Sequence, residues 1–128
     1  MVISYIGTLK TALYWVIFHI VRPSTLTVRL PMVFLGSITI FLFYALIDKI
    51  SSSRAALIGA ILLATDQTFL LTNTFDWGPV AIEHFLLVTG CLLAVEFANS
   101  GRTLHLASGS FVLGLAIWNK AIFLWALT

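Results

Sequence analysis

The chain has 128 residues, of which 60% are hydrophobic and only 9% are charged, whereas soluble domains average about 45–50% apolar and about 25% charged residues. So few charges exclude a soluble domain, whose surface needs polar cover. They predict an all-α integral membrane protein, whose backbone hydrogen bonds close within its helices. The net charge of +2 and the dispersed basic residues exclude a nucleic-acid partner.

The segment 1–29 comes first and differs from the rest of the chain. Its apolar run 9–21 is too short to span a bilayer and is flanked by basic residues. It contains Tyr14, Trp15 and His19, residue types that favour the membrane interface. We expect a helix that lies along the membrane surface, and a truncated spanning helix is the alternative.

The segment 30–128 holds about four apolar runs separated by short polar turns, and it predicts about four transmembrane helices. The first run has no charged side chain and places Pro31 in its first turn, where a missing N–H costs little. The predicted helices cover residues 30–47, 55–72, 80–97 and 103–128.

Short connections make successive helices antiparallel neighbours. The turns 48–54 and 99–102 should therefore lie on one side of the membrane, and the segment 1–29, the loop 72–79 and Lys120 on the other. Both sides carry lysine and arginine, so the positive-inside rule does not decide the orientation. Because the run at the C-terminus stops inside an apolar stretch, we expect a single-domain fragment (1–128) of a larger helical bundle.

Four charged residues on the second side are candidates for function, because ionisable groups at membrane depth are costly. Asp76 lies in an aromatic loop and would bind a metal, orient a sugar hydroxyl or act as a base, unless it only caps the next helix. Lys120 would hold a phosphate or snorkel to the interface. Lys10 would meet one lipid phosphate or head groups in general. Glu83 is placed to face the loop of Asp76.

Two further residues have simpler interpretations. His84 follows Glu83 directly, and adjacent helical residues point in different directions, so the two make a weak metal pair. We expect His84 to be a packed helix residue. Asp66 interrupts the second predicted spanning helix and could pair with a cation of a neighbouring helix.

Four stretches in register resemble a known family. The chain is similar to the multi-pass, C-type-fold glycosyltransferases that use polyprenyl-phosphate-linked sugars, among them the family 39 bacterial enzymes, the aminoarabinose transferases and the protein O-mannosyltransferases. The stretches are Tyr5-Ile6-Gly7-Thr8-Leu9-Lys10 with Leu13-Tyr14, Arg29-Leu30-Pro31, Phe75-Asp76-Trp77-Gly78-Pro79-Val80, and Gly114-Leu115-Ala116 followed by Lys120.

The resemblance implies roles for three residues. Lys10 and Lys120 look like the family lysines near the donor phosphate, and Asp76 looks like the second acidic residue of the active-site cavity. The principal catalytic aspartate of the family precedes the surface helix, and residues 1–4 contain no acidic residue. The fragment alone is therefore expected to be inactive.

The expected function is transfer of a sugar from a polyprenyl-phosphate donor to a lipid, glycan or protein acceptor. The expected location is the bacterial inner membrane, in contact with membrane lipids and with the site on the periplasmic side. No cofactor is certain, and a divalent metal stays open. The alternatives are a fragment of a transporter or flippase, which should show broken helices near the bilayer midplane, and a structural membrane subunit without a site.

Overall fold

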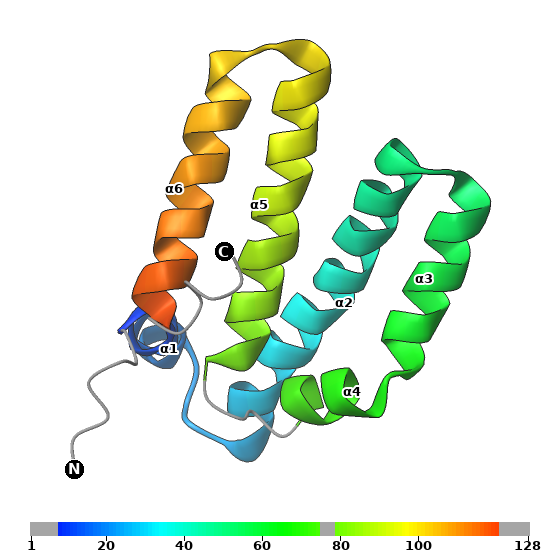
Figure 1. The fold of residues 1–128 in the computed structure, drawn as a ribbon. Helices are drawn as coiled ribbons and strands as arrows, with labels where there is room; N and C mark the ends of the chain where they lie inside the picture. Colours follow the sequence, from blue (N-terminus) through cyan, green and yellow to red (C-terminus); the bar gives the residue numbers. More distant parts are fainter. Residues whose placement is uncertain (1–7, 75–78, 121–128) are drawn as a thin grey trace.

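The computed structural model describes residues 8–74 and 79–120, and within these ranges α-helices joined by short connections make up the chain, with no β-strand. Figure 1 shows an antiparallel hairpin of α5 and α6, with α2 beside α5 and α3 folded back along α2. The short helices α1 and α4 lie at the end of the bundle opposite the two hairpin turns. The elements are α1 (Leu9–Ile20), α2 (Thr25–Ile50), α3 (Ser53–Thr65), α4 (Gln67–Thr74), α5 (Val80–Ser100) and α6 (Thr103–Asn119).

Two helices, α2 and α5, are long and apolar enough to cross a membrane, and α3 with α4 makes a third if the bent pair counts as one span. The expected count of about four is therefore not reached in the described residues. Helix α6 has 17 residues, or about 25 Å, against a hydrocarbon core of about 30 Å. Residues 121–128, predicted to complete the fourth span, lie outside the described residues.

Helix α2 begins earlier than predicted. Ser24 caps it, and its hydroxyl accepts a hydrogen bond from the Thr27 amide at 3.1 Å. The helix therefore includes residues 25–29, which the sequence had assigned to the surface segment. Pro31 lies inside the helix and not in its first turn, so the prediction for Pro31 was wrong. Proline is tolerated there because neighbouring helices and local adjustments satisfy the freed backbone groups of membrane helices.

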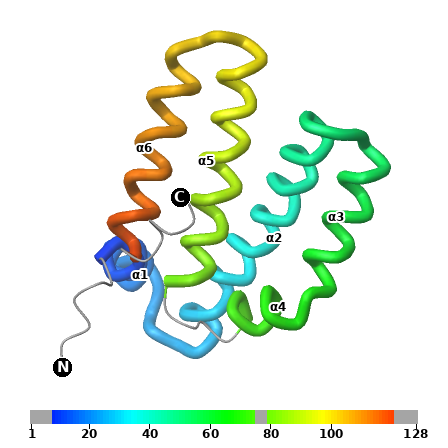
Figure 2. The backbone as a smooth tube through the Cα atoms, in the orientation of Figure 1, coloured from blue at the N-terminus to red at the C-terminus, as the bar shows by residue number. Residues whose placement is uncertain are grey.

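The second predicted spanning helix is broken. Helices α3 and α4 meet at Asp66 and are bent by 58°, as the tube in Figure 2 shows. The Asp66 side chain causes the break, because its Oδ1 accepts a hydrogen bond from the Phe69 amide at 2.7 Å and caps α4. The expected ion pair of Asp66 with a neighbouring cation is not present in the ranges that the structure describes.

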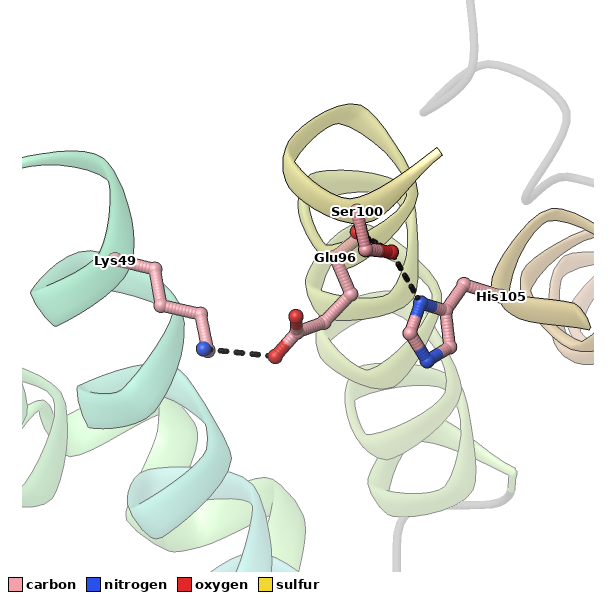
Figure 3. Close-up of polar contacts among 4 residues, drawn as sticks. All are labelled: Lys49, Glu96, Ser100 and His105. Carbon is pink, nitrogen blue, oxygen red and sulfur yellow. Dashed lines mark hydrogen bonds and ion pairs between the residues drawn. The ribbon is translucent and has the colours of Figure 1, made fainter. Parts of the chain in front are cut away.

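The two ends of the bundle are held by different contacts. At the turn end, Lys49 Nζ of α2 lies 2.7 Å from Glu96 Oε1 of α5, and His105 of α6 contacts Ser100 at 3.0 Å (Figure 3). The turns 48–54 and 99–102 therefore lie at the same end of the bundle. The opposite end is joined by a core from α1, α2, α5 and α6, made of Tyr14, Met32, Ala81, Ile82, Leu86 and Ala116.

Helix α1 forms where the sequence predicts it, with one face on the bundle. Tyr14 is buried, and its hydroxyl donates to the Val28 carbonyl at 2.5 Å, which fastens α1 to the start of α2. Trp15, the next residue, is 65% exposed. The helix therefore buries one side and offers aromatic and apolar side chains on the other, as an interfacial helix requires.

Candidate functional site

An ion pair links the start of α5 to the end of α6. Lys120 Nζ lies 3.5 Å from Glu83 Oε2, and the two side chains are 25% and 17% exposed. Glu83 stands in the first turn of α5, where the helix dipole favours a negative charge. Lys120 ends α6 as its C-cap residue. Two of the four predicted site residues therefore come together, and both charges are largely withdrawn from water.

Asn119 holds this arrangement in place. It is completely buried, and its Nδ2 donates a hydrogen bond to the Pro79 carbonyl at 3.0 Å. The same carbonyl accepts the Glu83 amide at 3.0 Å in the first turn of α5. One carbonyl thus fixes both the turn that carries Glu83 and the residue that precedes Lys120. The charged groups are placed by a buried contact and not by the flexible lysine side chain alone.

Lys10 lies on the neighbouring helix α1, which packs against α6. Its Nζ stands 5.8 Å from the centre of the Tyr14 ring, within reach of a cation–π interaction. Beside it is a cavity of about 470 Å³ lined by Lys10, Thr11, Tyr14, Trp15, Phe18 and Val28. The ammonium of Lys10 could contact an anionic head group, and the aromatic side chains beside it could contact an apolar chain, so the cavity fits an amphiphile.

Asp76, the predicted catalytic residue, lies outside the described residues. The candidate site therefore consists of the ion pair Glu83–Lys120 and of Lys10 on the adjoining helix, all at the end of the bundle opposite the hairpin turns. Within residues 8–74 and 79–120, no group of three or more His, Cys, Asp or Glu side chains is placed to hold a metal ion. In those ranges the arrangement offers two lysines at one end of the bundle, one of them paired with a carboxylate.

His84 turns away from Glu83, as predicted. Its ring stacks on Phe69 of α4, with centres 5.5 Å apart and planes 28° apart, whereas Glu83 reaches the end of α6. The prediction that His84 is a packed helix residue is confirmed. The two neighbours thus contact different helices, α4 for His84 and α6 for Glu83.

No protein-family model, curated protein or solved structure matches this chain. The roles of its residues are therefore argued from their own chemistry and placement.

Sequence reasoning missed Asn119 and Asn73. The sequence suggested no role for Asn119 beside Lys120, and it assigned Asn73 to the loop 72–79. In the structure Asn73 is buried in α4, and its Nδ2 donates a hydrogen bond to the Phe69 carbonyl at 2.7 Å. A signal was present, because an amide side chain inside an apolar segment needs a partner in lipid. That signal identifies the asparagine as a residue with a hydrogen bond to make, but it does not predict which group accepts the bond.

Proposed function

We propose that this chain is part of a membrane glycosyltransferase, which transfers a sugar from a polyprenyl-phosphate donor to an acceptor on the extracytoplasmic side. The observation that carries the proposal is the cation Lys120, held beside Glu83 at the same end of the bundle as Lys10. The proposed location is the bacterial inner membrane, with the site facing the periplasm.

The chemistry of the reaction requires cations at this end. The bond between the anomeric carbon and the phosphate oxygen breaks, and the phosphate leaves with the electron pair. Lys120 and Lys10 would stabilise the charge that develops on the phosphate, which is worth most in a poorly solvated cavity. Glu83 would hold Lys120 in position until the donor phosphate takes over the contact.

The acceptor hydroxyl forms the new bond to the anomeric carbon and must lose its proton. Asp76 is proposed to accept this proton or to orient the hydroxyl, from the position that the resemblance gives to the second acidic residue of the cavity. The cavity beside Lys10 supports the use of an amphiphilic donor, because its aromatic walls would receive the first isoprene units while the lysine meets the phosphate. A divalent metal stays an open part of the proposal.

A transporter or flippase is the second candidate, and the break between α3 and α4 favours it. The position of this break, however, argues against a transporter. Helix α3 has 13 residues, or about 20 Å, so the break lies beyond the middle of a hydrocarbon core of about 30 Å. The charged candidates also stand at one end of the helices and not at the midplane.

The test is a transfer assay in membranes from cells that make the intact protein, with radiolabelled polyprenyl-phosphate sugars as donors. We expect Lys120→Ala and Asp76→Asn to reduce transfer at least about a hundredfold at equal protein level, as removal of a group that stabilises developing charge, or of a general base, does. Lys49→Ala is the matched control, since it removes a lysine from an ion pair at the opposite end.

Three results would decide against the proposal. Full transfer by both site variants removes these residues from the site. A loss in Lys49→Ala as large as that in Lys120→Ala means that the site variants act through stability. Absence of transfer by the wild type with every donor, together with movement of a labelled lipid across vesicles, favours the flippase.

A further inference from the structure

Helix α3 is the shortest of the four helices that run along the bundle, and its outer face is apolar. It has 13 residues, and it accompanies α2 over only part of the length of the hairpin of α5 and α6 (Figure 1). The large side chains of this face are 55–65% exposed, and they are Leu57, Ile58, Ile61 and Leu62. An apolar environment therefore has to cover this face.

Exposed charged residues bound the apolar face of α3 at both ends. Arg54 stands in the first turn of α3, and Asp66 follows its last residue. At about 1.5 Å per residue, Arg54 and Asp66 lie about 18 Å apart along the helix axis. The stretches without charge are longer on the other helices, about 28 Å on α2 and about 27 Å on α6. These longer stretches are bounded by Arg29 and Asp48, and by Arg102 and Lys120. They approach the thickness of a hydrocarbon core of about 30 Å, and the face of α3 does not.

The Asp66 end of α3 has to meet water or lipid head groups. The Oδ1 atom of Asp66 caps α4 through the Phe69 amide, so this short side chain cannot extend to a distant membrane surface as lysine or arginine can. Gln67 and Thr68 follow it and are exposed as well. A break in a helix at membrane depth is tolerated only where protein buries it or water reaches it. Because these residues are exposed, water must reach the break.

The small residues of α3 indicate that lipid, and not another helix, covers its outer face. Helices in membranes pack against each other through small residues. On α3 these residues face the bundle, where Ala56 is completely buried and a Cβ atom at Gly59 would stand 3.4 Å from the Phe43 ring of α2. The outward side chains are leucine and isoleucine, which are as apolar as lipid chains. The outer face therefore fits the hydrocarbon of a bilayer.

The geometry points to an interaction surface on α3 for a locally thinned bilayer, with a hydrocarbon core of about 20 Å at this face and about 30 Å around the other helices. Helix α4 lies in the head-group layer, because five of its eight residues are polar. Thinning a bilayer has a modest cost per ångström, whereas a carboxylate and a broken backbone in hydrocarbon are more costly. This surface is separate from the proposed sugar-transfer site and does not depend on it.

Paired cysteines test whether both ends of α3 reach water at the same time. In a Cys91→Ala background of the full chain, Ser53→Cys and Gln67→Cys stand fourteen positions apart at the two ends of α3, about 21 Å along the axis. Leu104→Cys and Trp118→Cys are the matched control with the same spacing on α6. All four positions are exposed. The probe is a membrane-impermeant maleimide, added to either side of sealed phosphatidylcholine vesicles.

We expect both α3 positions to react rapidly, from opposite sides, because about 21 Å spans the thinned core. At least one α6 position should react about tenfold more slowly, since the same distance does not span a core of about 30 Å. Labelling after the vesicles are opened corrects for intrinsic reactivity. Protection of either α3 position would overturn the proposal. Equally fast labelling of all four positions would also overturn it, because the thinning would not be local. If a variant does not fold, Arg54→Cys and Thr68→Cys give the same spacing on α3.

A second measurement decides whether lipid covers the outer face of α3. A fluorophore on Ile61→Cys is quenched by phosphatidylcholine with a spin label in the middle of its chain, if that chain reaches the face. Phe111→Cys is the control, because it is exposed at the corresponding position of α6, eight residues after the helix begins. We expect the two positions to be quenched to within about twofold of each other. Quenching of Phe111→Cys alone would mean that a protein partner or a second copy covers α3, and would overturn the proposal.

Discussion

At the scale of single residues, the candidate site depends on one buried amide. Asn119 is fully buried and bonds to a carbonyl 40 residues away, and that carbonyl also anchors the turn carrying Glu83. The carboxylate and Lys120 could be selected from sequence because charges in an apolar segment are rare. The pairing of Glu83 with Lys120 could not be predicted, because the sequence does not say that the start of α5 lies beside the end of α6.

Asn119→Ala should lower the free energy of unfolding by about 1–2 kcal/mol, through loss of the hydrogen bond to Pro79 and the space left by the side chain. Asn99→Ala is the control. It removes an exposed asparagine from the last turn of α5 and should change stability by less than about 0.5 kcal/mol. Unfolding by sodium dodecyl sulfate, followed by circular dichroism, measures both. Equal values for the two variants would contradict the anchoring role of Asn119.

At the scale of elements, side-chain caps and small residues decide where helices begin, break and meet. Ser24 starts α2 ahead of its apolar run, and Asp66 ends α3 inside one. Gly36 of α2 lets α4 approach, because a Cβ atom there would stand 2.9 Å from Asn73 Oδ1. A Cβ atom at Gly114 of α6 would meet no other atom within 4 Å. The two glycines look alike in sequence and differ only in what faces them.

The two glycines should respond to alanine with opposite signs. Gly36→Ala forces Asn73 from a position fixed by its bond to Phe69, and it should cost about 1–3 kcal/mol of unfolding free energy. Gly114→Ala meets nothing within 4 Å and should gain about 0.5–1 kcal/mol from helix propensity. Midpoints of unfolding in detergent measure both changes. A gain in Gly36→Ala would show that the contact between α2 and α4 is loose.

At the scale of the whole molecule, the bundle has two distinct ends. One holds the hairpin turns and the pair Lys49–Glu96, and the other holds α1, α4 and the pair Glu83–Lys120. Many apolar side chains face outward between these ends, as a lipid-facing surface permits and a soluble one does not. The ends should therefore lie on opposite sides of a membrane.

Cysteine labelling checks this arrangement. In a Cys91→Ala background, we expect a membrane-impermeant maleimide to label Ser51→Cys and Asn99→Cys from the same side of sealed vesicles, and Thr8→Cys from the other. All three positions are exposed. Labelling after the vesicles are opened controls for reactivity. Labelling of all three positions from one side would contradict a spanning bundle.

The sequence by itself determined the class of the protein, the two turns, and the extents of α1 and α5, because these follow from composition and from polar breaks within a few residues. It also singled out Lys10, Glu83 and Lys120, since charge in an apolar segment is visible without a fold. The structure also showed the early start of α2 and the break at Asp66, which depend on local caps chosen among several polar residues nearby. Only the tertiary structure decided the pairing of Glu83 with Lys120 and the burial of Asn119, because packing between helices distant in the chain chooses each of these partners.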